Sequence, residues 1–204
     1  MTKQLIVSGD LAEDTDRAIQ QLRGWQQAGV THILDLRYEW SDEDLVAEHA
    51  PSVVYCSAPT DDDGRRQPDE WFNAGIVFAI EALAHPQSVL LVHCHMGVNR
   101  APSMAFRIML ELGWDPIEAL DGIRDARPIA DIGYAADALN HYHRAHAVPA
   151  TRQAEDRDRL KTWVRGYSTT TQAQADLANL DGRYTDREFE VDYADYLDWL
   201  NDEP

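Results

Sequence analysis

The chain has 204 residues, of which 44% are hydrophobic, enough for the core of one ordinary domain plus an extension. It carries 36 acidic and 18 basic residues, a net charge of −18, which argues against nucleic acid or anionic membrane as the main partner. The two cysteines, Cys56 and Cys94, exclude a disulfide framework and favour a reducing compartment. The sequence shows neither a membrane-span pattern nor a signal pattern, so we expect a cytoplasmic location.

Short apolar runs alternate with helical patterns along the first three quarters of the chain. Apolar runs predict strands at residues 5–8, 31–36, 52–56 and 88–92, the first of them an edge strand. Helical periodicity, caps and stops predict helices from an acidic start at 10–16 to Gly29, and at 41–49 (capped by Ser41), 70–84, 101–112, 116–126 and 132–146. Residues 58–68 read as a loop. This alternation predicts an α/β fold with a central, mostly parallel sheet flanked by helices.

The character of the chain changes near Val148. Residues 151–166 are highly charged with few apolar anchors, and residues 181–204 contain nine acids and two arginines. We therefore predict a main domain at 1–148 and an acidic, helical extension at 149–204. One helix face of the extension carries an apolar stripe made of Phe189, Tyr193, Tyr196, Leu197 and Leu200. We interpret this stripe as a helix that packs on the domain or on itself, with partner binding as the alternative.

Residues 93–100 read His-Cys-His-Met-Gly-Val-Asn-Arg and link a buried strand to a helix. A strand, a tight loop and a helix N-terminus form a cradle of backbone N–H groups that suits a phosphate dianion. A cysteine in that cradle, Cys94, is expected to be held as a thiolate nucleophile. Gly97 allows the backbone to turn inward, and the planar fork of Arg100 suits two phosphoryl oxygens. The stretch therefore combines a nucleophile, an anion site and a cationic clamp.

The pattern His93-Cys94-x-x-Gly97-x-x-Arg100 resembles the signature loop of the cysteine-based protein tyrosine phosphatase superfamily. The preceding strand, the following helix and Ala-Pro-Ser at 101–103 are similar to its dual-specificity branch, and the resemblance runs from about residue 5 to about residue 146. It implies catalysis by Cys94 and Arg100 through a phosphocysteine, without cofactor or metal. It also implies that His93 orients the loop, and that the phosphate-binding loop comprises His95, Met96, Gly97, Val98 and Asn99.

The family's general acid is an aspartate on a mobile loop roughly thirty residues before the cysteine. Asp62 lies 32 residues before Cys94, in a stretch that begins with proline, and is the choice here. Its neighbours Asp61 and Asp63 stay open as alternatives. Related enzymes often place a basic residue near a substrate anion, and Arg127 falls at that place, which implies a substrate-binding role.

One residue departs from the family pattern. Serine or threonine usually follows the loop arginine and assists the breakdown of the phosphocysteine, whereas this chain has Ala101. Ser103 lies two residues on, so a helix would point it to the other side. We therefore predict slow hydrolysis of the intermediate.

The resemblance implies a metal-independent phosphatase for phosphotyrosine, with phosphoserine and phosphothreonine as further substrates, acting on a phosphorylated protein or a small phosphoester. The run Gly97-Val98-Asn99-Arg100 is similar to the RNA 5′-triphosphatase branch, although the net charge and Asp62 weigh against it. A low-turnover, phosphate-binding pseudophosphatase is the third hypothesis. Ala101 alone favours this hypothesis, and the intact Cys94 and Arg100 oppose it.

Overall fold

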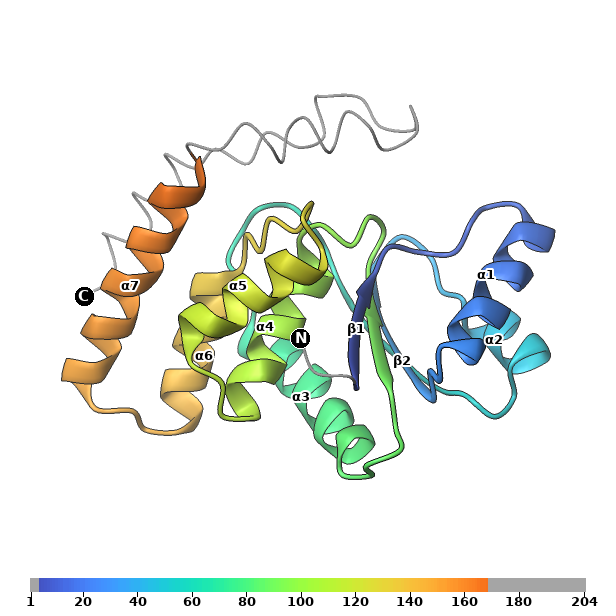
Figure 1. Ribbon diagram of the computed structural model, residues 1–204, viewed down its shortest axis with the longest axis horizontal. Helices are drawn as coiled ribbons and strands as arrows, with labels where there is room; N and C mark the ends of the chain where they lie inside the picture. The colour runs from blue at the N-terminus through green and yellow to red at the C-terminus, as the bar shows by residue number, and fades with distance from the viewer. Residues whose placement is uncertain (1–3, 169–204) are drawn as a thin grey trace.

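The computed structural model describes residues 4–168, and a parallel four-stranded sheet is their frame (Figure 1). The strand order is β1-β4-β2-β3, and every neighbouring pair is parallel. The bounds are Leu5–Ser8 for β1, His32–Arg37 for β2, Val54–Thr60 for β3 and Leu90–His93 for β4. The predicted α/β fold is therefore confirmed, as is the edge position of β1. None of the helices within residues 4–168 combines the length and apolar character needed to cross a membrane.

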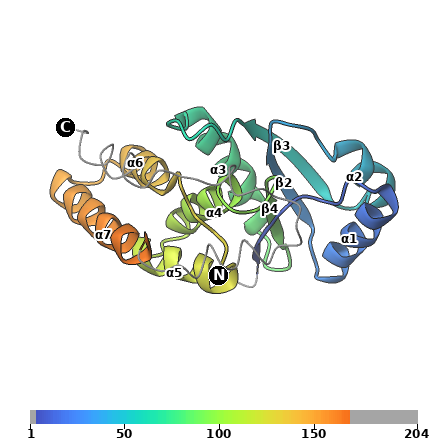
Figure 2. The same ribbon diagram turned by 90° about the horizontal axis from the view of Figure 1, so that it is seen from above.

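Helices cover both faces of the sheet (Figure 2). One face carries α1 and α2, and the other carries α3 and α4 with α5 to α7 beyond them. Because both faces are covered, all four residues of the inner strand β4 are buried. The helix bounds are Thr15–Gln27 (α1), Glu43–His49 (α2), Asp69–Leu83 (α3), Arg100–Glu111 (α4), Pro116–Ala126 (α5), Ala135–Ala145 (α6) and Ala150–Ser168 (α7).

Helix α4 is the centre of the larger core. Its residues from 100 to 110 are all buried, and it contacts β4, α3, α5 and α6. A helix enclosed on every side tolerates little displacement, because close-packed interiors transmit any change in volume. The residue that begins this helix, Arg100, is therefore held on a rigid element.

Several predicted boundaries were wrong, and three of the differences have a clear physical reason. Strand β3 continues to Thr60 because it follows β2 beyond an irregularity in the β2–β3 register. Helix α2 has Asp42 as its N-cap rather than Ser41, and the Asp42 carboxylate pairs with Arg37. Helix α6 begins at Ala135, because Ile132 has a φ of +61° and does not continue a right-handed helix.

Helix α7 packs on α5 and α6, and its Leu160 and Val164 belong to the main core. Arg159 also forms a bidentate ion pair with Asp115, at 2.8 and 2.6 Å. The first part of the expected extension is thus a helix in contact with the domain. The division at residue 148 stays a prediction, and the apolar stripe at 189–200 lies outside the described residues.

Candidate active site

The loop between β4 and α4 encloses the sulfur of Cys94. This residue is 2% exposed, and its Sγ accepts the backbone N–H groups of Gly97 at 3.3 Å and Ala101 at 3.4 Å. Helix α4 begins at Arg100, so the amides of its first turn, which have no partner within a helix, face the loop. The side chain predicted to be the nucleophile therefore lies against amide donors.

Glycine at position 97 is required by the contact between this loop and the end of β1. Gly97 has a φ of +65°, and a Cβ there would lie 2.5 Å from the carbonyl carbon and oxygen of Ser8. Next to this contact, the Asp10 N–H donates to the His95 carbonyl at 3.0 Å. A side chain at position 97 would push the loop away from the sheet.

The protonation of Cys94 depends on opposing effects. Burial raises the pKa of its thiol, and the Asp62 carboxylate adds to that rise. Arg100 and the amides of Ala101 and Gly97 lower the pKa, but burial outweighs them. The thiolate expected from the sequence is thus favoured by the loop and opposed by desolvation. A carboxylate beside Arg100 reduces the field that the arginine exerts on the sulfur.

Arg100 is buried, with both terminal nitrogens bound on one edge. NH1 donates to Oε2 of Glu39 at 2.9 Å and to the Thr60 carbonyl at 3.0 Å, and NH2 donates to Oε1 of Glu39 at 2.7 Å. Nε makes no hydrogen bond within the described residues and lies 3.4 Å from Oδ2 of Asp62. The edge formed by Nε and NH2 is the one that faces Asp62.

Glu39 was missed in the sequence analysis. It lies two residues after β2, and β2 is the neighbour of β4 in the sheet, so the carboxyl ends of the two strands meet at one edge. Burial alone would raise the pKa of Glu39, but its hydrogen bonds with Arg100 bring the pKa below its ordinary value. The signal in the sequence was a carboxylate directly after a parallel strand, where ligand sites collect.

Among the three consecutive aspartates, Asp62 points toward the cysteine loop. Its Oδ1 accepts the side-chain amide of Asn99 at 2.7 Å and the hydroxyl of Tyr134 at 2.7 Å. Asp63 instead accepts the N–H of Arg65 within its own loop. The structure therefore brings Asp62 beside Arg100 and Asn99, while its role as acid stays a prediction.

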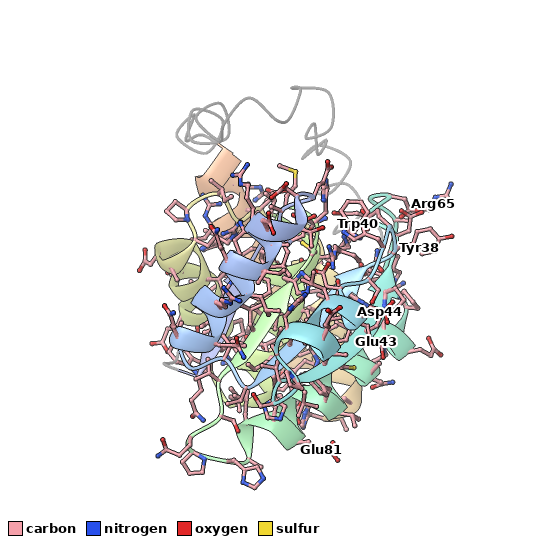
Figure 3. All side chains as sticks on the ribbon, turned by 90° about the vertical axis from the view of Figure 1, so that its right-hand side faces the viewer. Tyr38, Trp40, Glu43, Asp44, Arg65 and Glu81 are labelled. Carbon is pink, nitrogen blue, oxygen red and sulfur yellow. The ribbon has the colours of Figure 1, made fainter. Side chains whose placement is uncertain are left out.

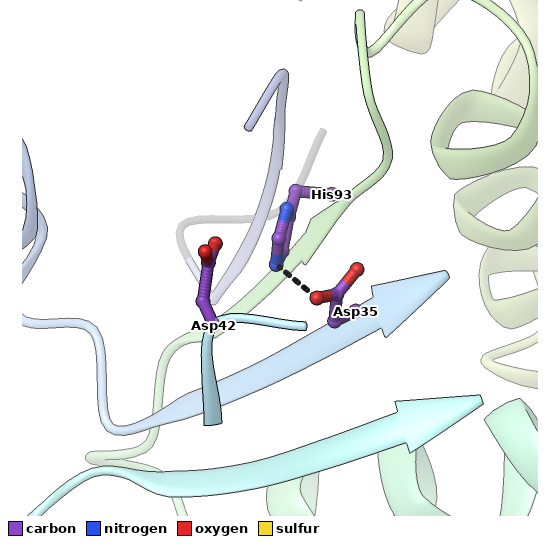
Figure 4. Close-up of side chains that lie close together, drawn as sticks. All are labelled: Asp35, Asp42 and His93. Carbon is purple, nitrogen blue, oxygen red and sulfur yellow. Dashed lines mark ion pairs between the residues drawn. The ribbon is translucent and has the colours of Figure 1, made fainter. Parts of the chain in front are cut away.

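His93 lies behind the loop in a buried polar cluster. Its Nε2 is 3.7 Å from Oδ2 of Asp35, the contact dashed in Figure 4. Burial lowers the pKa of His93 to about 4, so the ring is neutral near pH 7. Asp35 in turn accepts the Tyr55 hydroxyl at 2.5 Å and two hydrogen bonds from Arg37, at 2.9 and 2.6 Å. The cluster fixes the end of β4, from which Cys94 follows.

The same cluster contains ligand atoms close enough for a metal ion. Asp35, Asp42 and His93 offer atoms that lie within 4.8 Å of one another. The guanidinium of Arg37 already lies between the carboxylates, with NH2 at 2.6 Å from Oδ2 of Asp35 and from Oδ2 of Asp42. Because a cation of the protein neutralises these acids, we assign the cluster a structural role.

Aromatic side chains flank Glu39 at the edge of the site. Tyr38 is 72% and Trp40 is 43% exposed. Figure 3 shows both at the same end of the molecule as Arg65, which belongs to residues 61–68 between β3 and α3, called the acid loop below. The Trp40 ring meets the ring of His95 edge-on at 5.1 Å. The His95 ring also pairs with Asp10, at 2.7 Å between Nδ1 and Oδ2. These contacts hold the outer part of the loop.

The comparisons with known proteins concern the fold. No family model matches the sequence, and no curated protein matches it. Human DUSP28 superposes with a TM-score of 0.59 at 18% identity, over 72% of this chain and 97% of its own. PTPMT1 gives a TM-score of 0.57 at 16% identity, over 72% and 94%. A human tyrosine phosphatase-like serine/threonine/tyrosine-interacting protein gives 0.54 at 15%, over 72% and 95%. The chain has a dual-specificity phosphatase-like fold.

Within this dual-specificity phosphatase-like fold, Arg127 supports the loop. Its Nε donates to the Gly97 carbonyl at 2.5 Å and its NH2 to the Met96 carbonyl at 2.6 Å. The Asp131 N–H donates to the Val98 carbonyl at 2.7 Å, so the segment after α5 braces the outer side of the loop. These contacts direct Arg127 to the backbone of the protein, and a role in substrate binding stays a prediction.

Ser103 turns away from Cys94. Its hydroxyl donates to Oδ1 of Asn99 at 3.3 Å and accepts the N–H of Tyr134 at 3.1 Å. Ala101 has no hydroxyl and offers Sγ only its backbone N–H. Among the described residues, the hydrogen bonds to Sγ thus come from backbone amides alone.

Proposed function

We propose that this protein is a phosphatase that hydrolyses phosphate monoesters through a phosphocysteine, with phosphotyrosine as the main substrate and phosphoserine and phosphothreonine as further ones. The observation that carries the proposal is the meeting of two distant segments: the loop that carries the amide-bound sulfur of Cys94 and the guanidinium of Arg100, and Asp62 beside that guanidinium. These are the groups that phosphoryl transfer to a thiol requires.

In the first step, the thiolate form of Cys94 attacks phosphorus and the bond to the leaving oxygen breaks. Asp62 gives its proton to that oxygen, so the alcohol departs neutral. Nε and NH2 of Arg100 bind two phosphoryl oxygens on the edge that Glu39 leaves free. The loop amides bind the remaining charge. The nucleophile, the acid and the donors to the phosphoryl oxygens in this step all belong to the protein.

In the second step, water attacks the phosphocysteine while Asp62 accepts its proton. Phosphate leaves, and the sulfur is restored. Only the amide of Ala101 assists the departing sulfur from the position that usually provides a hydroxyl. We therefore expect this second step to be slow and the first to appear as a burst, which Ala101→Ser should reduce.

The mechanism is tested by hydrolysis of aryl phosphates by the wild type, Cys94→Ser and Asp62→Ala, with Asp63→Ala as the matched control. Cys94→Ser should abolish turnover. Asp62→Ala should lower kcat/KM by about 10²–10⁴-fold, the range of general acid catalysis, while Asp63→Ala changes it little. Turnover by Cys94→Ser would overturn the mechanism, and an equal loss in both aspartate variants would move the acid elsewhere.

The substrate class is tested separately. A panel of phosphopeptides carrying phosphotyrosine, phosphoserine or phosphothreonine is compared with a 5′-triphosphate RNA. Preference for phosphotyrosine supports the proposal. Faster release of phosphate from the RNA would replace it with the triphosphatase hypothesis.

A further inference from the structure

Tyr134, the residue before α6, contacts the acid loop from outside the signature motif. It is 3% exposed, and its hydroxyl donates to Oδ1 of Asp62 at 2.7 Å. The same hydroxyl accepts the N–H of Gly64 at 3.2 Å. One buried phenol therefore binds both the carboxylate and the backbone of the loop that carries it. Burial raises the pKa of Tyr134, with a further rise from Asp62, so the hydroxyl keeps its proton.

Asn99 provides the second donor to the same oxygen. Its Nδ2 lies 2.7 Å from Oδ1 of Asp62, and its own Oδ1 accepts the hydroxyl of Ser103. Ser103 is fully buried on α4 and also accepts the backbone N–H of Tyr134. The two donors to Asp62 are thus linked through one serine on α4, whose residues from 100 to 110 are all buried.

The geometry distinguishes the two oxygens of the carboxyl group. Oδ1 of Asp62 accepts two hydrogen bonds, whereas Oδ2 lies 3.4 Å from Nε of Arg100. A protonated carboxyl group has one O–H donor, and an oxygen that already accepts two donors is a poor place for that proton. In the acid form that the proposed function requires, the proton is therefore placed on Oδ2, the oxygen beside Nε of Arg100.

We propose that Tyr134, together with Asn99, is a positioning residue that holds Oδ1 of Asp62 and so presents Oδ2 to the leaving oxygen. This inference rests on the proposed function. Its physical basis is orientation: a proton donor fixed within hydrogen-bond reach of the leaving oxygen avoids the cost of ordering the loop in the transition state.

The test compares Tyr134→Phe with Tyr142→Phe, which removes a hydroxyl from the later part of α6. Phenyl phosphate has a poor leaving group that needs the acid, and p-nitrophenyl phosphate has a good one that needs it less. We expect Tyr134→Phe to lower kcat/KM about tenfold for phenyl phosphate, the scale of one hydrogen bond, and about twofold for p-nitrophenyl phosphate. Tyr142→Phe should behave as wild type with both.

A second arm combines Tyr134→Phe with Asp62→Ala. If Tyr134 acts through Asp62, it should have no further effect once the carboxylate is gone. An equal loss with both substrates, or an undiminished loss in the Asp62→Ala background, would overturn the inference, because a general loss of structure produces both.

Gly133→Ala keeps the proposal falsifiable if Tyr134→Phe does not fold. A Cβ at this position would lie 2.9 Å from Oδ1 of Asn99, so the flexible amide must move while both donors remain. We expect a loss that is again larger for phenyl phosphate, and an equal loss for both substrates would contradict it. Cys94→Ser separates the two claims: residual turnover by Cys94→Ser refutes the proposed function, whereas a cysteine-dependent enzyme indifferent to Tyr134→Phe refutes only the inference.

Discussion

Two arginines of this protein, Arg37 and Arg100, are each only 2% exposed, yet their surroundings differ in one respect. Arg37 gives Nε and NH2 to Asp35, and NH2 also lies 2.6 Å from Asp42. Arg100 gives NH1 and NH2 to Glu39, while Nε makes no hydrogen bond within residues 4–168. The edge that a phosphate would use is filled by hydrogen bonds in Arg37, whereas in Arg100 its Nε only faces Asp62 at 3.4 Å, without a hydrogen bond within the described residues. A buried arginine is thus structural or ligand-binding according to which edge its carboxylate takes.

The largest effect, a loss of stability, is expected at Arg37, whose Nε–NH2 edge is filled by Asp35. Arg37→Met leaves the carboxylates of Asp35 and Asp42 buried without their cation, which costs about 3–5 kcal/mol of unfolding free energy. Urea unfolding measures this, with the exposed Arg65→Met as the control, expected within about 0.5 kcal/mol of wild type. A loss below about 1 kcal/mol would show that the cluster does not depend on Arg37.

Substitution of Arg100 should affect activity more than stability. Arg100→Lys keeps the charge but removes the planar pair of donors, so kcat/KM for an aryl phosphate should fall about 10²–10³-fold. The unfolding free energy should change less than in Arg37→Met, because Glu39 is partly exposed. If Arg100→Lys loses stability and keeps its activity, Arg100 is structural like Arg37, and the proposed difference between the two arginines is wrong.

The buried cluster around Arg37 includes His93 and should make the unfolding free energy depend on pH. Burial lowers the pKa of His93 from 6.5 to about 4, so the unfolded chain binds the extra proton between these values. Neutral His93 contributes fully to stability above pH 6.5, and up to ~3 kcal/mol of that contribution is lost as the pH falls to about 4. His93→Asn should flatten the fall in unfolding free energy over this window. An unchanged slope would assign the acid sensitivity to other groups.

The smallest effect is expected from Glu39, the carboxylate that binds Arg100. Glu39→Gln keeps one acceptor oxygen but loses the charge and half of the bidentate contact with Arg100. We expect kcat/KM to fall about tenfold, the scale of one charge-assisted hydrogen bond, with the melting temperature little changed. Wild-type kinetics would show that Arg100 is positioned by α4 alone.

The sequence predicted what is local in the chain. Strand β4, the cysteine loop and α4 are consecutive, so one stretch of residues carries the strand pattern, the glycine and the helix start together. Gly97 is an example, because its positive φ belongs to the tight turn itself, although its close contact with Ser8 is a second requirement that involves a distant segment. Asp62 was found by its spacing along the chain from Cys94, which a family resemblance provides.

The residues that the sequence did not reveal depend on contacts between distant segments. Glu39 reaches Arg100 because β2 pairs with β4, and the strand order cannot be read from the pattern of either strand. Tyr134 reaches Asp62 across 72 positions because α6 packs on α4. Arg127 was assigned from its place in the chain, which gave no information about its hydrogen bonds to the loop carbonyls.

The central claim is that Cys94 forms a covalent phosphoryl intermediate, and its direct test is rapid quenching. The wild type is mixed with p-nitrophenyl phosphate, quenched in acid within milliseconds, digested and analysed by mass spectrometry. The peptide that contains residues 93–100 should carry a phosphoryl group on Cys94, at a level close to one per active enzyme, because its breakdown is slow. The account would be contradicted if the Cys94-dependent enzyme released phosphate as fast as p-nitrophenol from the first turnover, with no modified peptide at any time.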